Sequence, residues 1–191
     1  MKKILIAALA PALIATAFCS SAAVTVDGGK INFAGSVVAA PCAVDNDSES
    51  QTVTLGQVAT NKLVAKGDSS SAVNFNINLT GCDLTTSEAL DPTQTANYTK
   101  ASIIFNGATL GESTTLALAG SGAGESVAKN VGIQIFHANQ AVTVDGSSAT
   151  VATSLVAGKN SIPFSVAYVA TDANVVAGSA NSTVNFQVSY D

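Results

Sequence analysis

The last eight residues of the chain, 184–191, read VNFQVSYD, and apolar and polar side chains alternate along them. Successive side chains of a β-strand point to opposite faces, so this period of two predicts a strand with one buried face. The residues expected on that face are Val184, Phe186, Val188 and Tyr190. A strand that continues to the penultimate residue is unusual because chain ends commonly fray, so we expect a partner to hold it in place. An ordinary edge strand is the alternative at this point.

The same alternation recurs along the chain, and turn-forming residues separate its occurrences. Strands are predicted at residues 31–33, 73–79, 131–135 and 164–168. Turns are predicted where glycine follows Asp or Asn or is repeated, at residues 27–29, 106–107, 120–124 and 145–146. A stretch around residues 57–64 is compatible with a short helix, but no long amphipathic period is present. Short strands separated by frequent turns predict an all-β sandwich in a single domain.

The first part of the sequence has the pattern of a secretory signal. Lys2 and Lys3 precede an apolar run of about 15 residues, 4–18, and small residues follow it. A membrane anchor is the alternative, but the run is shorter than the roughly 20 residues that span a bilayer. We therefore predict a signal peptide at residues 1–23, which includes Cys19, and export of the remaining chain.

The remaining chain is acidic and has few ionisable side chains. Loss of Lys2 and Lys3 leaves 6 cations against 13 acids, a net charge of about −7, and the chain has no Arg or Trp. Binding to nucleic acid through its phosphates is therefore not expected. His137 is the only histidine, and we expect a solvent-facing or hydrogen-bonded structural residue, not a general base. The glycines at 120–124 lack the GK[ST] sequence of a phosphate-binding loop, so they are interpreted as a turn. With one histidine, two cysteines expected to be bonded and scattered carboxylates, the sequence predicts no catalytic residue, metal site, cofactor or small-molecule substrate.

Cys42 and Cys82 are the two cysteines outside the predicted signal peptide. An even pair of cysteines in an exported chain predicts a disulfide, because the periplasm is oxidising. Metal ligation and thiol catalysis are the alternatives. Metal ligation would need further Cys or His ligands at suitable spacing, and a catalytic pair would have the close CxxC spacing. A disulfide that closes a loop of about 40 residues is worth roughly 4 kcal/mol in the chain-entropy model.

Several parts of the sequence together resemble a known family. The terminal strand has a penultimate Tyr190 and is preceded by Gly178, fourteenth from the end. A strand-like segment, VTVDGGKINF, stands at residues 24–33, ahead of the first remaining cysteine. The spacing within residues 37–56 and 71–82, together with residues 130–135 and 160–164, is similar to that of type 1 fimbrial major subunits. The mature sequence thus resembles the pilins of the chaperone–usher pathway, and departs from them only at residues 85–100, which are longer and more polar.

This resemblance implies an incomplete immunoglobulin-like β-sandwich that is completed by a donor strand from a partner chain. Residues 24–35 would be the N-terminal donor-strand extension and residues 36–191 the pilin domain. The donor face would consist of Thr25, Asp27, Gly29, Ile31 and Phe33, with Gly29 allowing two backbones to approach closely. The chaperone-binding strand beside the vacant position would involve Gly178, Val184, Phe186, Val188, Tyr190 and Asp191.

The function implied by the resemblance is that of a structural subunit of a surface fimbria, which polymerises by donor-strand exchange and supports cell adhesion. The expected partners are a periplasmic pilus chaperone, whose basic residues would hold the carboxylate of Asp191, an outer-membrane usher, identical neighbouring subunits, and minor or tip subunits. The expected location is the extracellular fimbria, reached through the periplasm. Two alternatives are a minor adaptor subunit of the same kind of pilus and a self-complete secreted β-sandwich that acts as a binding module.

Overall fold

The computed structural model describes residues 26–37, 39–85, 97–120, 122 and 124–191. Its contacts divide the chain into two units, residues 1–36 and residues 37–191. In the first unit, residues 26–36 belong to no helix or strand, and all of them are exposed. Among the described residues, no helix is long and apolar enough to cross a membrane. The predicted signal peptide lies outside the described residues.

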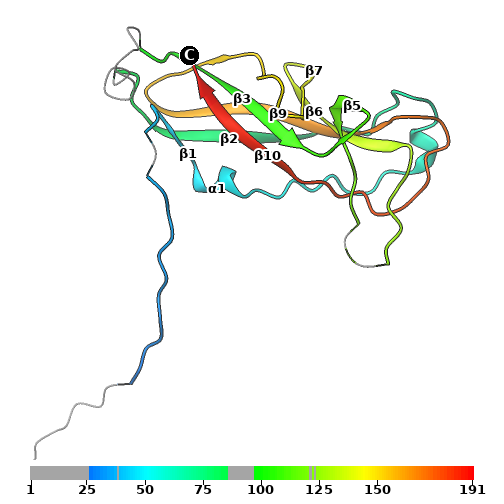
Figure 1. Cartoon of the computed structure of the whole chain (residues 1–191), viewed down its shortest axis with the longest axis horizontal. Helices are drawn as coiled ribbons and strands as arrows, with labels where there is room; N and C mark the ends of the chain where they lie inside the picture. The colour runs from blue at the N-terminus through cyan, green and yellow to red at the C-terminus, as the bar shows by residue number, and fades with distance from the viewer. Residues whose placement is uncertain (1–25, 38, 86–96, 121, 123) are drawn as a thin grey trace, which may run out of the picture. The chain divides into compact units, whose positions relative to one another are not determined.

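The second unit is a sandwich of two antiparallel sheets, as the sequence predicts (Figure 1). Sheet A has seven strands in the order β1-β2-β9-β6-β5-β4, with β7 also paired to β6. Its strands are β1 (Ala43–Val44), β2 (Val73–Cys82), β4 (Thr109–Leu110), β5 (Glu112–Leu116), β6 (Val131–His137), β7 (Gln140–Ala141) and β9 (Gly158–Ala170). Sheet B has the order β10-β3-β8, with strands β3 (Lys100–Gly107), β8 (Thr153–Ser154) and β10 (Val184–Tyr190). The helix α1 (Asn46–Glu49) and the 3-10 turn η1 (Thr60–Lys62) come between β1 and β2 in the chain.

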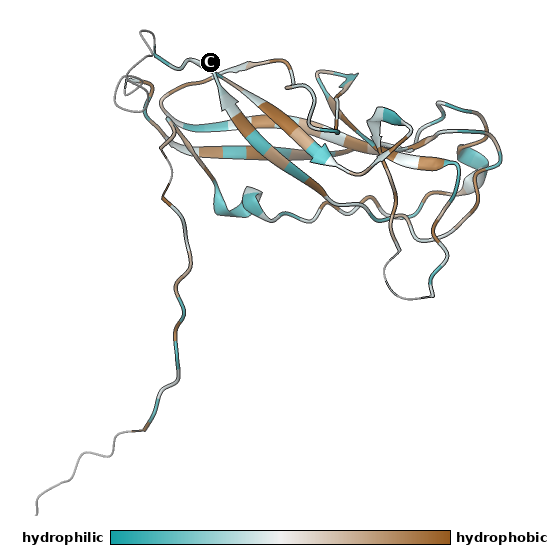
Figure 2. Cartoon of the chain, in the orientation of Figure 1, coloured by the Kyte–Doolittle hydropathy of each residue, from teal (hydrophilic) through white to brown (hydrophobic). Residues whose placement is uncertain are grey.

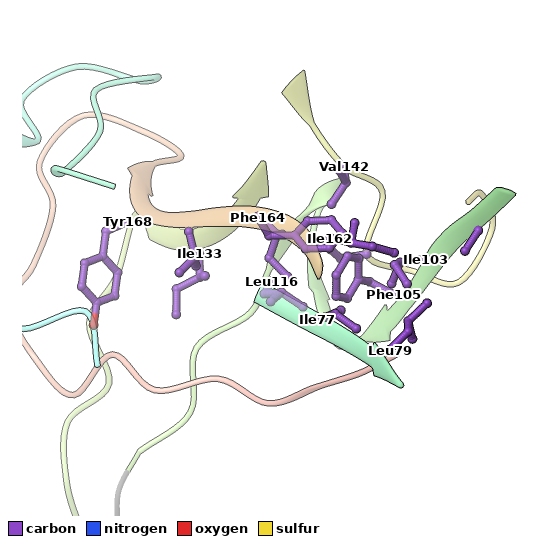
Figure 3. Close-up of a cluster of buried hydrophobic side chains, with 14 of the residues drawn as sticks. Ile77, Leu79, Ile103, Phe105, Leu116, Ile133, Val142, Ile162, Phe164 and Tyr168 are labelled. Carbon is purple, nitrogen blue, oxygen red and sulfur yellow. The ribbon is translucent and has the colours of Figure 1, made fainter. Parts of the chain in front are cut away.

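The core lies between the two sheets and is built mainly from alternate residues of the long strands (Figure 3). Parts of β3, β6 and β9 are buried on the other face as well. Phe164 of β9 stacks on Phe75 of β2, with ring centroids 5.5 Å apart. It also meets Phe105 of β3 edge-on at 5.2 Å. Because Phe105 belongs to sheet B and the other two rings to sheet A, this trio joins the two sheets at the centre of the sandwich.

One central strand, β9, contains a proline although it has a partner strand on each side. Proline lacks the N–H donor, which normally excludes it from the middle of a sheet. Pro163 is tolerated because the pairing of β6 with β9 ends at Phe136 opposite Ser165. Beyond that point, Nδ1 of His137 donates to the carbonyl oxygen of Pro163 at 3.0 Å, and the imidazole lies 4.9 Å from the ring of Phe164. The His137 side chain thus supplies the hydrogen bond that β6 no longer makes, as expected of a structural histidine.

Replacement of His137 by Ala is expected to lower the free energy of unfolding by about 1–2 kcal/mol, because the carbonyl of Pro163 loses its partner. Denaturant-induced unfolding of the disulfide-intact chain measures this change. The control is Gln140→Ala, an exposed position opposite His137 in the same hairpin, which should change stability by less than about 0.5 kcal/mol. Equal losses in the two variants would contradict the role given to the imidazole.

The turn predicted at Asn106 and Gly107 is wrong. These two residues end β3 and pair with Asn185 and Val184 of β10. Space is limited at 107, because a Cβ there would lie 2.7 Å from Cδ2 of Leu116, which would have to move, and 3.2 Å from the carbonyl oxygen of Thr183. Within residues 57–64, where the sequence is compatible with a short helix, only the three residues of the 3-10 turn η1 are helical. In the polar region 85–100, Lys100 already belongs to β3, and residues 86–96 lie outside the described residues.

Candidate functional site

The even-numbered residues of β10 direct their backbone N–H and C=O groups away from β3. Asp191 and Lys100 exchange two backbone hydrogen bonds of 3.0 Å, and the next pair in the register is Tyr190 opposite Ala101. Bonded and non-bonded pairs alternate along an antiparallel ladder, so this next pair and every second pair after it are non-bonded. The backbone groups that therefore face the outer edge of sheet B are those of Val184, Phe186, Val188 and Tyr190. In the described part of the chain, these groups make no backbone hydrogen bond.

The same four residues of β10 present apolar side chains to the core. All four are partly buried and pack against the buried cluster. Figure 2 shows the alternation directly, as bands of high and low hydropathy along β10. The outer edge of sheet B thus combines unpaired backbone groups with an apolar face that is only half covered. Such an edge costs stability and favours pairing with a further strand.

A second segment, residues 51–58, packs onto the same core without joining either sheet (Figure 1). The side chains of Val53, Leu55 and Val58 are partly buried against the core. No strand is formed there, and among the described residues the segment makes no backbone–backbone hydrogen bond. Its backbone is therefore also available to a strand that pairs with it.

The outer edge of β2, in contrast, is covered by neighbouring groups. The backbone N–H of Asn78 donates to Oγ of Ser48 at 2.9 Å, and its carbonyl accepts from the N–H of Asp45 at 2.9 Å. Nε2 of Gln51 donates to the carbonyl of Asn76 at 3.1 Å. The outer edge of β10 in sheet B is therefore more open than the outer edge of β2 in sheet A.

Tyr190 ties the end of β10 to the disulfide. Cys42 and Cys82 are bonded to each other, as the sequence predicts, and Nδ2 of Asn160 donates to Sγ of Cys82 at 3.2 Å. Oη of Tyr190 donates to the carbonyl oxygen of Cys42 at 3.1 Å, and its ring meets that of Tyr98 edge-on at 6.4 Å. One end of the β10 edge is therefore fixed to the start of the sandwich.

Burial raises the pKa of the Tyr190 phenol. The folded state thus favours the neutral form, and this contribution to stability is complete below the ordinary tyrosine pKa of about 10 and is lost as the pH rises through the raised value. Tyr190→Phe is expected to lower the free energy of unfolding near neutral pH by about 1 kcal/mol, through loss of the hydrogen bond to Cys42. It should also reduce the alkaline loss of stability, to which Tyr168 still contributes because burial raises its pKa too. Unfolding curves at neutral and alkaline pH measure both effects, and an unchanged alkaline decline would contradict the second.

Two residues that the resemblance assigns to the β10 edge lie outside the strand. Gly178 precedes it, since β10 begins at Val184. Asp191 follows it, and its main-chain oxygen accepts hydrogen bonds from the N–H groups of Thr99 and Lys100 at 2.7 and 3.0 Å. The structure therefore brings together on the edge only the four alternating residues of the strand itself.

The residues of the predicted donor face belong to the first unit. Ile31 and Phe33 are 78% and 91% exposed. Gly29 has a φ of 101°, and its N–H donates to Oδ1 of Asp27 at 3.3 Å. A turn of this kind interrupts strand geometry. Ile31 and Phe33 thus stand after the turn, and Thr25 lies outside the described residues.

The described residues offer little for catalysis. They contain no group of three or more His, Cys, Asp or Glu that could hold a metal ion. A hollow of about 690 Å³ beside β4 is lined mainly by apolar and small residues, and Lys129 is the one charged residue among those described around it. Ser126 and Thr171 add hydroxyl groups to this lining, but the described lining residues include no Asp, Glu or His that could activate a hydroxyl, so the hollow does not form a catalytic constellation.

Solved structures with a similar fold include subunits of pili. The chain matches a subunit in the structure of a chaperone–usher pilus with a TM-score of 0.71 and 26% identity, over 90% of this chain and 100% of that one. It matches the P pilus rod subunit PapA with a TM-score of 0.64 and 26% identity, over 80% of this chain and 100% of that one. The fold is therefore the immunoglobulin-like sandwich of chaperone–usher pilus subunits.

Relatives in sequence define the family. The family model described as fimbrial protein matches residues 31–191. The chain is 40% identical over 193 residues to the type-1 fimbrial protein, A chain, of Escherichia coli strain K12, which covers 100% of this chain and 98% of the relative. It is also 40% identical, with the same coverage, to the fimbrial subunit type 1 of Klebsiella pneumoniae. The chain belongs to the fimbrial protein family.

Proposed function

We propose that the chain is a structural subunit of a surface fimbria, in which each copy lends its N-terminal segment as a β-strand to the next copy. The open edge at β10 supports this most directly, because unpaired backbone groups and half-buried apolar side chains belong to the same four residues. In recognition by strand addition, main-chain hydrogen bonds give affinity and alternate side chains fix the register. A head-to-tail contact of this kind does not close on itself, so a filament follows.

The donor strand is best placed after the turn at Asp27 and Gly29. Residues 30–37 contain no positive φ. Ile31 and Phe33 share their face with residues 35 and 37, where Gly35 leaves room for close approach of two backbones. Burial of each large apolar side chain contributes about 1.5–3 kcal/mol, and each new backbone hydrogen bond about 0.5–1.5 kcal/mol. These terms are large enough to offset the freedom that two copies lose on association.

The subunit reaches the cell surface through the periplasm. A pilus chaperone covers the β10 edge there, and an outer-membrane usher directs its exchange for the extension of the next copy. Identical neighbours and minor or tip subunits complete the fimbria, which supports cell adhesion. A structural role of this kind requires no enzymatic activity.

Two other functions would use the same features differently. A minor adaptor subunit would have the same edge and extension but would occur in few copies, so abundance in purified fibres separates the two roles. A self-complete sandwich would not accept a strand from another copy, and it would stay monomeric at every concentration.

A synthetic peptide of residues 24–37 tests strand donation. Added in excess to the mature chain, it is expected to cap growing filaments and to shorten the polymers measured by sedimentation velocity. The control peptide exchanges Ile31 with Asn32 and Phe33 with Ala34, which keeps the composition but moves both apolar side chains to the other face. It should leave filament length unchanged. A chain that stays monomeric and binds neither peptide would show that the sandwich is self-complete.

A further inference from the structure

The chain enters β10 through residues 176–182, which are hydrogen-bonded along their length to two other parts of the chain. The first part, residues 176–179, shares four backbone hydrogen bonds of 2.8 to 3.1 Å with residues 126–129. Oγ of Ser179 also donates to Oε2 of Glu125 at 2.5 Å. Two isolated bridges, Lys129 with Val176 and Val127 with Ser179, therefore hold this part of the segment.

The part of the segment nearer to β10, residues 181–182, is held by residues 117–119. Ala119 and Asn181 exchange two backbone hydrogen bonds, of 2.7 and 3.3 Å. Oγ of Ser182 donates to the carbonyl oxygen of Ala117 at 2.8 Å. We refer to residues 117–119 and 126–129 together as the clamp.

Gly178 is the position at which the clamp approaches most closely. A Cβ at this position would lie 2.5 Å from both the N of Ala128 and the O of Ser126, and 2.6 Å from the C of Val127. These are backbone atoms, which cannot rotate away as the end of a side chain can. The φ of Gly178 is not positive, so the requirement for glycine arises from space and not from backbone conformation.

The register in which β10 pairs with β3 decides which side chains of β10 face the core beside the open edge. A slip of one residue would turn the four apolar side chains outward and bring Asn185, Gln187 and Ser189 to the core. Backbone hydrogen bonds to β3 do not prevent such a slip, because they are independent of side-chain identity. Burial normally does, but the four side chains are only partly buried while the edge is open. Contacts at the two ends of the strand therefore contribute to fixing the register: the hydrogen bond of Tyr190 to Cys42 at its end, and those of residues 176–182 before its start.

We propose that Gly178 is a positioning residue for strand acceptance: it lets the clamp close on residues 176–182, and the clamp fixes the register in which β10 pairs with β3. Free backbone groups and apolar side chains then coincide at the same four residues. The consequence for strand acceptance rests on the proposed function, whereas the role in register does not.

Amide hydrogen exchange tests the role in register. The background is the mature chain with Ile31→Asp and Phe33→Asp, which removes the apolar donor face and keeps copies separate. In this background, the amides of Asn185, Gln187 and Ser189 are expected to be protected, and those of the even-numbered residues to exchange quickly. Gly178→Ala should reduce the protection of the amides of Asn185, Gln187 and Ser189 at least about tenfold, so that odd-numbered and even-numbered residues of β10 exchange at similar rates. Amides within β9 should keep their protection.

The matched control is Gly122→Ala, since a Cβ there meets nothing within 4 Å and the φ is not positive. Ser182→Ala is a milder variant that removes only one clamp hydrogen bond, and it should produce a smaller loss with the same pattern. Equal protection in the Gly178→Ala and Gly122→Ala chains would overturn the proposal. A parallel loss of protection in β9 would also overturn it, because that result reports general destabilisation.

Peptide binding to the same chains tests the consequence for strand acceptance. The 24–37 peptide should bind the Gly178→Ala chain at least about tenfold more weakly than the Gly122→Ala chain, because a slipped strand presents polar side chains to it. Equal binding would overturn the consequence for strand acceptance. Failure of the peptide to bind either chain, with the exchange pattern as expected, would refute strand donation and support the register role alone.

Discussion

A mature chain carrying Phe33→Asp is expected to stay monomeric under conditions in which the unmodified chain forms filaments. Phe33 is 91% exposed in the extension, and strand donation would bury it against the core of another copy. The substitution removes about 1.5–3 kcal/mol of burial and adds the cost of placing an unpaired carboxylate among apolar side chains. Association should weaken at least about a thousandfold, as measured by sedimentation velocity over a concentration series.

The control for this variant is Asn32→Asp, which adds the same charge on the opposite face of the same segment. It is expected to assemble within about tenfold of the unmodified chain, because an exposed charge is well solvated and largely screened by salt. Filaments of normal length from the Phe33→Asp chain would exclude Phe33 from the donor face.

Phe164→Ala is expected to lower the free energy of unfolding by about 3–5 kcal/mol, the usual cost of removing a buried aromatic ring. Phe164 is 3% exposed and contacts the rings of Phe75, Phe105 and His137. Its loss would leave a cavity where the two sheets meet (Figure 3). Denaturant-induced unfolding with the disulfide intact measures the change.

Phe136→Ala provides the comparison, because Phe136 is only partly buried and lies opposite Ser165, on the face of β9 that does not carry Phe164. Its loss is expected to cost less than about 2 kcal/mol. If both substitutions destabilised the chain equally, the aromatic trio would not be the link between the sheets.

The strands β2 and β10, which have a clean period of two, could be predicted from the sequence, and β3 could not. The strand predicted at residues 31–33 does not form, because these residues belong to no helix or strand. In β2 and β10, polar residues separate the apolar ones, so the buried face is evident. In β3, Ile103, Ile104 and Phe105 are consecutive, and Ser102 on the outer face is also buried. Burial on both faces hides the alternation, and Gly107 at the end of the strand has the appearance of a turn residue.

The alternation of Val184, Phe186, Val188 and Tyr190 could be predicted from the sequence, but the open edge could not be derived from periodicity. A donor strand and a native strand have the same period, so the sequence pattern does not show which strand lacks a partner. The resemblance supplied that expectation. It also singled out Gly178, but the reason for a glycine there is a close contact with residues 126–128, which are distant in sequence. The Asx turn that precedes Ile31 likewise depends on backbone angles that residue types alone do not fix.

The hydrogen bond between Tyr190 and Cys42 bears on how a filament would carry tension. Tensile force would be applied to each subunit through the covalent link between the N-terminal segment and Cys42. It would be passed to the neighbouring subunit through the strand paired along β10. Tyr190 ends β10, and its hydroxyl oxygen lies 3.1 Å from the carbonyl oxygen of Cys42, so one end of the strand that receives the load is tied to the point at which the load enters. The disulfide passes the remaining load to Cys82 at the end of β2. A stretched filament would therefore extend at the links between subunits, while the interior of each sandwich stays folded.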